Sequence, residues 1–260
     1  MNIEFVPLLQ IQRDLYSIPR GPERFNAYLK TMVNSDSTDV RLPPLVAMNP
    51  MGKDHVPALL ESLLTMEAEA AAARASAEAV RRLAGVPGDF NLGLVVVDDL
   101  MGGWSNRYFS EFFHRFEGPS ATKRGWIGAW IWSSEAPTLQ AVREEVMGVI
   151  FRAAYVLEHG AALNLANMLV QEGHVMAMAG CSQPSLDAPD LDYTREVLQP
   201  HLAATDLPTL IPCLFGDPAA HALGYPPQGL SHRAGLALAL SEAQLGTRRP
   251  DSVPTTGSHD

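Results

Sequence analysis

The residues of this chain that could do chemistry lie in the turns after three apolar runs. These runs cover residues 44–48, 92–97 and 126–132. Two adjacent carboxylates, Asp98 and Asp99, follow the second run, and Glu135 follows the third. Carboxylates placed in this way can act as acid and base or hold a divalent cation. We therefore take Asp98, Asp99 and His55 as candidate catalytic residues. The two aspartates and Glu135 are candidate ligands of a divalent cation, the only cofactor that the sequence suggests.

The same turns contain side chains that suit an anionic ligand. Lys53 and Arg107 would add full positive charges beside predicted helix starts, whose unpaired N–H groups already favour anions. Gly52, in the first turn, would allow the main chain to approach a ligand closely. The candidate substrate-binding residues are Asn49, Lys53, Arg107, Ser134 and Trp104. A small molecule with a phosphate or carboxylate group would fit this set.

Each of these residues also has a purely structural explanation. Ser134 can cap a helix, and Asp99 can fold its own turn through its side chain. Successive side chains of a strand face opposite sides, so Asp98 and Asp99 can face one ligand only if the chain has already turned. The sequence therefore leaves a ligand site and a set of structural turns as alternatives.

Familiar catalytic signatures are absent from the sequence. The Gly-Lys pair at 52–53 lacks the glycine and the Ser or Thr of a phosphate-binding loop, because Ala47 and Asp54 stand at those positions. There is no HExxH metal motif and no GxSxG around Ser133. The two cysteines show no metal-type spacing, and we expect reduced thiols. No stretch carries motifs that identify a family.

The order of the predicted elements indicates an α/β fold. Strands and helices alternate between residues 44 and 158, which favours parallel strands joined by right-handed crossovers. We expect a small, mostly parallel sheet of at least three strands, with covering helices and an all-helical C-terminal half. Residues 3–9 could be a further short strand or an extended lead-in. The expected parts are an α/β core at residues 1–160, a helical portion at residues 161–246 and a disordered tail at residues 247–260. The helical portion could pack on the core or form a small second domain.

One long helix is predicted from residue 54 to residue 84. Its apolar residues repeat in steps of four and three and form a heptad-like seam, at Leu59, Leu63, Met66, Ala70, Ala73, Ala77, Val80 and Ala84. A helix of this length would extend about 45 Å. The seam could pack on helices of the same chain, or part of it could form a homodimer contact.

The bulk composition narrows the class of partner. The chain has 260 residues, 47% of them hydrophobic, and a formal net charge of −10. An acidic protein is a poor non-specific binder of nucleic acid or of anionic membranes. No apolar run is long enough to span a membrane, and the N-terminus lacks the pattern of a signal peptide. We expect a soluble, cytoplasmic protein without nucleic-acid or membrane partners.

Two hypotheses of function follow. The first is a small-molecule enzyme, a hydrolase or transferase that acts on an anionic substrate at the carboxyl ends of the strands, where ligands bind in parallel α/β sheets. The second is a non-catalytic binding or assembly protein that acts through its long Ala-rich helix and its helical C-terminal half.

Overall fold

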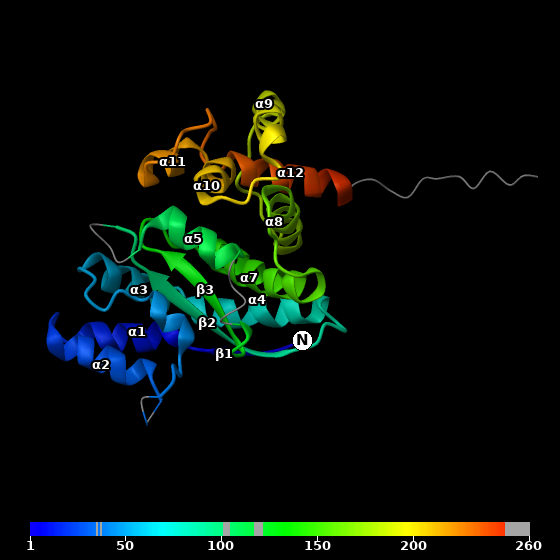
Figure 1. Cartoon of the computed structure of the whole chain (residues 1–260). Coiled ribbons are helices and arrows are strands. Elements are labelled where there is room, and N and C mark those ends of the chain that lie inside the picture. Colours follow the sequence, from blue (N-terminus) through cyan, green and yellow to red (C-terminus); the bar gives the residue numbers. More distant parts are fainter. Residues whose placement is uncertain (35, 37, 101–104, 117–121, 248–260) are drawn as a thin grey trace, which may run out of the picture.

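The computed structural model shows a small parallel sheet with helices on both sides and a group of helices stacked against one end (Figure 1). It describes residues 1–34, 36, 38–100, 105–116 and 122–247. The sheet has the order β1-β2-β3, and both pairs of neighbouring strands are parallel. The strands are β1 (Asn2–Val6), β2 (Asp89–Val97) and β3 (Trp126–Trp132). The predicted α/β class, with its small parallel sheet and helical C-terminal half, is confirmed.

One predicted strand is wrong. Residues 44–48 do not join the sheet, because Pro43–Ala47 form the short 3-10 helix η1. The pair Pro43-Pro44 has no N–H groups to donate to a strand ladder and begins a helical turn instead. The η1 turn packs across β2 and β3. The third strand is β1 at the N-terminus, one of the two alternatives that the sequence left open.

Helices cover both faces of the sheet. On one face, α1 and η1 pack on the central strand, where a Cβ at Gly93 would lie 2.3 Å from Leu8 and 3.3 Å from Pro44. On the other side, α4 and α7 pack against each other and against the outer strands (Figure 1). The helices of this part are α1 (Leu8–Ser17), α2 (Pro22–Met32), α3 (His55–Thr65), α4 (Ala68–Arg82), α5 (Arg107–Phe116) and α7 (Leu139–His159).

The predicted single helix over residues 54–84 is also wrong. It is broken into α3 and α4 at Glu67, which has a left-handed backbone with φ of 57°. The break lets α3 pack on α1 while α4 packs on α7 and β1, two directions that one straight helix cannot follow. The buried face of α4 is Ala68, Ala72, Ala75, Ser76 and Ala79. Two alanines of the predicted seam, Ala70 and Ala77, are exposed.

Among the described residues of the C-terminal half, all regular secondary structure is helical. Its elements are α8 (Leu165–Ala179), α9 (Ala188–Leu198), η2 (Gln199–His201), α10 (Leu207–Phe215), α11 (Asp217–Leu223) and α12 (Ala234–Thr247). These helices share a buried apolar cluster with α5, and a second cluster lies around the sheet. No described helix is both long and apolar enough to cross a membrane. The predicted tail, beyond Thr247, lies outside the described residues.

The contact between α8 and α12 generates a prediction about stability. A Cβ added at Gly173 of α8 would lie 2.4 Å from the main-chain oxygen of Ala239 in α12. The Gly173→Ala variant should therefore force the helices apart and lower the free energy of unfolding by about 1–3 kcal/mol. Chemical denaturation followed by circular dichroism measures the change.

The matched control is Gly148→Ala in α7, where no atom lies within 4 Å of the added Cβ. There the higher helix propensity of alanine should raise the free energy of unfolding by up to about 1 kcal/mol. Equal effects of the two substitutions would show that the close approach at Gly173 does not matter.

Candidate functional site

The predicted turns do meet at the carboxyl ends of the strands. Asp98, which follows β2, is buried, and its carboxylate accepts hydrogen bonds from Asn49 Nδ2 at 2.7 Å and Ser133 Oγ at 3.1 Å. His55 Nε2, at the start of α3, lies 2.8 Å from the same carboxylate. Because Asn49 follows η1, the first turn reaches this edge although no strand precedes it. We call Asn49, His55, Asp98, Asp99, Ser133 and Ser134 the strand-end cluster.

Asp99 points into the same cluster because the chain turns directly after Val97. Its carboxylate accepts hydrogen bonds from Ser133 Oγ at 3.0 Å, from the Ser134 amide at 2.9 Å and from the Ser134 hydroxyl at 2.6 Å. The Nη1 atom of Arg107 lies 3.5 Å from Oδ2 of Asp99. Adjacent aspartates thus share Ser133, but protein donors already occupy the oxygens of both.

The structure brings Asp98 and Asp99 together, but Glu135, the third candidate metal ligand, does not join them. Glu135 is half-exposed and pairs with Arg107 at 2.6 Å instead of approaching Asp98. Among the described residues there is no group of three or more His, Cys, Asp or Glu side chains that could hold a metal ion.

The candidate anion-binding residues differ in their surroundings. Arg107 donates to Glu111 at 3.0 Å and to Glu135, and its guanidinium lies 4.2 Å above the ring of Trp132. Side chains therefore already engage much of its hydrogen-bonding capacity. Lys53 is exposed at the edge of the cluster. Trp104 lies outside the described residues.

Among the described residues, His55 is the member of the strand-end cluster whose side chain keeps an unpaired nitrogen. Asp98 binds its Nε2, whereas its buried Nδ1 has no hydrogen-bond partner in the described part of the chain. A carboxylate that orients one ring nitrogen leaves the other free to accept a proton. This Asp–His pair could act as a general base.

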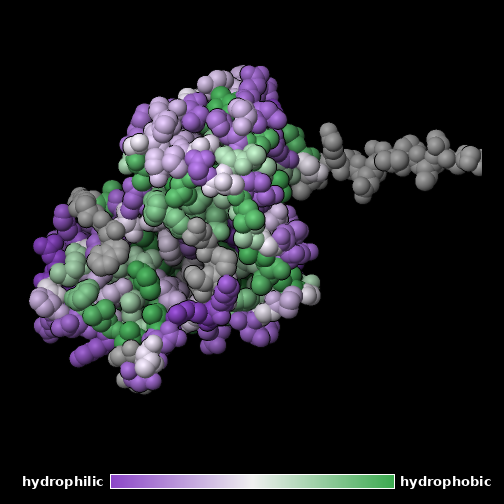
Figure 2. Space-filling model, in the orientation of Figure 1, coloured by the Kyte–Doolittle hydropathy of each residue, from purple (hydrophilic) through white to green (hydrophobic). Residues whose placement is uncertain are grey.

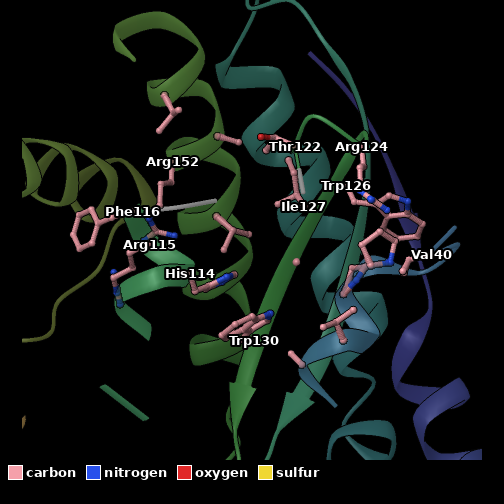
Figure 3. Close-up of a pocket in the computed structure, with 18 of the residues that line it drawn as sticks. Val40, His114, Arg115, Phe116, Thr122, Arg124, Trp126, Ile127, Trp130 and Arg152 are labelled. Carbon is pink, nitrogen blue, oxygen red and sulfur yellow. The ribbon is translucent and has the colours of Figure 1, made fainter. Parts of the chain in front are cut away.

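A cavity of about 630 Å³ lies along the open edge of β3, between that strand, η1, α5 and α7 (Figure 3). We call it the β3-edge pocket. On the face of the molecule shown in Figure 2, hydrophobic residues gather between the sheet and the C-terminal helices. The apolar lining consists of Val40, Pro43, Pro44, Val46, Ala47, Phe116, Trp126, Ile127, Val149, Ala153, Val156 and Leu157.

The charged groups that line this pocket are all basic. They are Arg115, Arg124 and Arg152, and no Asp or Glu is among the described lining residues. Figure 3 shows Arg115 and Arg152 on one side of the cavity and Arg124 beside Trp126 on the other. Arg124 is paired with the exposed Asp39 at 2.5 Å. The pocket is therefore an apolar cavity with positive groups at both ends.

Buried carboxylates hold the guanidinium groups of Arg115 and Arg152 in place. Glu172 of α8 is fully buried and accepts hydrogen bonds from Arg152 Nε at 2.7 Å and Nη2 at 2.9 Å, and a further one from Arg115. Burial by itself would raise the pKa of Glu172, but Arg152 and Arg115 outweigh it and lower the pKa to about 2. Glu172 is therefore ionised at neutral pH.

Glu111 of α5 is the second such carboxylate. It accepts hydrogen bonds from Arg233 at 2.6 and 2.9 Å, from Arg115 at 2.7 and 2.9 Å, and from Arg107. Burial opposes ionisation, but these three guanidinium groups hold the pKa of Glu111 well below its ordinary value. We call Glu111 and Glu172 with Arg107, Arg115, Arg152 and Arg233 the guanidinium network.

A flat aromatic wall completes the pocket. The rings of His114 and Trp130 are stacked, with centroids 3.8 Å apart and planes at 9°. Glu145 accepts the Trp130 amide at 3.0 Å, and its carboxylate lies 3.5 Å from His114 Nε2. Burial lowers the pKa of His114, although Glu145 acts in the opposite direction. His114 is therefore a neutral ring at pH 7.

Sequence reasoning missed this pocket. Trp126 and Trp130 belong to the predicted strand at residues 126–132 and to no candidate site, and Arg115 and Arg152 belong to no motif. One signal was available, because Arg152 interrupts the apolar stretch Ile150-Phe151-Arg152-Ala153 in a helix. A charged residue on a buried helix face is a strong indication of a buried partner or of a site.

The guanidinium network predicts how stability depends on pH. The folded pKa of Glu172 is lower than its ordinary value of 4.5, so its stabilising effect is complete above about pH 4.5 and is lost as pH falls toward 2. Glu172→Gln should lower the free energy of unfolding at pH 7 by about 3–5 kcal/mol, because guanidinium groups lose their buried partner. It should also flatten the fall in stability below pH 4.5, as urea titrations at several pH values would show.

The control is Glu242→Gln, which breaks the exposed pair with Arg195. An exposed ion pair contributes little, so neither stability at pH 7 nor its acid dependence should change measurably. A variant at Glu172 that behaves like this control would contradict the role assigned to the network.

None of the known proteins compared with this chain resembles it closely enough to indicate a function. No family model and no curated protein matches the sequence, and no solved structure matches the fold. Any assignment of function depends on the geometry of the strand-end cluster and the β3-edge pocket.

Proposed function

We propose that this protein binds a small organic anion with an aromatic or branched apolar body in the β3-edge pocket. The observation that carries the proposal is an apolar cavity of about 630 Å³ whose charged lining groups are all basic. Small-molecule sites typically have volumes of about 300–1,000 Å³, with mostly apolar walls and a few polar groups that fix orientation. The pocket meets each of these conditions.

Arg152 is the residue that best explains selectivity for an anion. The Nε and Nη2 atoms of Arg152 donate hydrogen bonds to Glu172, and no described residue forms a hydrogen bond with Nη1 of Arg152. The two bonds to Glu172 fix the guanidinium plane, so little side-chain entropy remains to be lost when a ligand binds. Low polarity around the cavity strengthens the attraction between this guanidinium and a carboxylate.

Two ligands of the same shape test the proposal. We expect 3-phenylpropionate to bind at least tenfold more tightly than 3-phenylpropan-1-ol, because only the first has a carboxylate. Arg152→Met removes the positive charge, and it is made together with Glu172→Gln so that no buried carboxylate is left without a partner. This double variant should bind 3-phenylpropionate roughly tenfold to a hundredfold more weakly. The alcohol should bind the variant and the parent protein equally, as measured by titration calorimetry or tryptophan fluorescence.

Substitutions that place a bulky ring inside or outside the cavity test whether the ligand binds there. Ala153→Phe places a ring in the cavity and should abolish binding of both ligands, whereas Leu139→Phe on the exposed face of the same helix should leave binding unchanged. The proposal is wrong if the carboxylate does not bind. It is also wrong if Ala153→Phe and Leu139→Phe behave alike.

A hydrolase or transferase at the strand-end cluster is the second candidate function. The specific observation in its favour is His55, whose Nε2 is held 2.8 Å from Asp98 while Nδ1 has no described partner. In this role His55 would remove a proton from a hydroxyl or water nucleophile, and Asp98 would stabilise the resulting imidazolium. Lys53 at the edge of the cluster would attract an anionic substrate.

The His55 substitution tests this candidate. A panel of nitrophenyl esters and phosphates would reveal activity, and His55→Gln should lower the rate by about a hundredfold or more if His55 is the general base. The exposed His221→Gln is the control and should not change the rate. Equal rates for the two variants would remove His55 from the mechanism.

A further inference from the structure

The main chain of β3 offers hydrogen-bonding groups to the pocket. Among the described residues, β3 pairs with β2 alone and forms an edge of the sheet. The Asn91 amide donates to the Gly125 carbonyl, and the Ser133 amide donates to the Val97 carbonyl. Peptide groups alternate in direction along a strand, so those of residues 127, 129 and 131 face β2. The groups of Trp126, Gly128 and Trp130 therefore face the open edge, where all three residues line the pocket.

Only part of this open edge is satisfied by the protein. Glu145 accepts the Trp130 amide at 3.0 Å. No described residue pairs with the outward N–H and C=O of Gly128, which is only partly buried. An unpaired strand edge at the side of a cavity is a template for another extended chain. Gly128 thus presents one donor and one acceptor to a ligand.

We propose that the ligand of the β3-edge pocket is an N-acylated amino acid, a dipeptide being its simplest extension. This inference rests on the proposed function. In an antiparallel pair, one residue exchanges both hydrogen bonds with the residue opposite. The amide N–H of the ligand would donate to the Gly128 carbonyl, and one carboxylate oxygen would accept from the Gly128 amide. The other carboxylate oxygen remains for Arg152.

Charge selects the acylated form over the free amino acid. A free α-amino group would bring a positive charge into a cavity whose charged lining groups are the guanidinium groups of Arg115, Arg124 and Arg152. Acylation removes that charge and replaces it with a neutral amide. The side chain of the ligand would lie against the stacked His114 and Trp130 rings and the apolar residues of α7.

Four small molecules test the inference on the unmodified protein. We expect N-acetyl-L-phenylalanine to bind about tenfold more tightly than N-acetyl-N-methyl-L-phenylalanine, which lacks the amide N–H. L-Phenylalanine should bind most weakly, and 3-phenylpropionate should bind like the N-methylated compound. Equal affinities for the two acetylated compounds would overturn the pairing with Gly128 and leave the proposed anion pocket standing. Failure of every carboxylate to bind would overturn both.

A variant supplies the protein side of the test. Gly128→Pro removes the outward N–H, and an edge strand tolerates proline where that N–H makes no ladder bond. It should weaken N-acetyl-L-phenylalanine about tenfold, with an unchanged circular dichroism spectrum; unchanged affinity would contradict the inference. If the variant does not fold, the NMR chemical shift of the Gly128 amide in the parent protein tests the pairing instead. It should shift downfield when the ligand binds, and a resonance that does not move would refute the pairing.

Discussion

The burial of Glu111 and Glu172 is the constraint on which the rest of this structure depends. A carboxylate taken out of water costs several kcal/mol unless close cations and hydrogen bonds offset the loss. Here the partners come from different elements: Glu111 lies on α5, Glu172 on α8, Arg152 on α7, and Arg233 just before α12. A shift of the C-terminal helices relative to α5 or α7 would leave a buried charge unpaired. The network therefore holds the helical half in one position against the sheet.

The same network shapes the β3-edge pocket. Glu111 and Glu172 do not line the cavity, but two of their guanidinium partners, Arg115 and Arg152, do. The charged side chains that line the pocket are thus cationic, although the chain as a whole carries a formal charge of −10. A local arrangement of ion pairs decides the sign of the potential at a site, and net charge does not.

The two candidate sites differ in how far the protein itself satisfies their polar groups. Hydrogen bonds from Asn49, Ser133 and Ser134 occupy both aspartates of the strand-end cluster, which leaves the ring of His55 as its reactive group. In the pocket, by contrast, the main chain of Gly128 lacks a described partner, and the protein supplies few polar atoms to the cavity. Unsatisfied groups beside an apolar cavity favour a bound ligand, and saturated carboxylates favour a structural role.

Much of the fold and part of the site follow from local pattern alone. The apolar runs at 92–97 and 126–132 predicted β2 and β3, and the polar residues after them predicted that Asp98, Asp99 and Ser134 would meet, because parallel strands end at a common edge. The predicted strand at 44–48 is replaced by the 3-10 helix Pro43–Ala47, because Pro43 and Pro44 have no N–H groups for a strand ladder. The predicted helix at 54–84 is broken because α3 and α4 pack on different partners. Only the tertiary structure decided the pocket. Arg115, Arg152 and Glu172 are far apart in the sequence, and their pairing depends on how α5, α7 and α8 cross, which no local periodicity specifies.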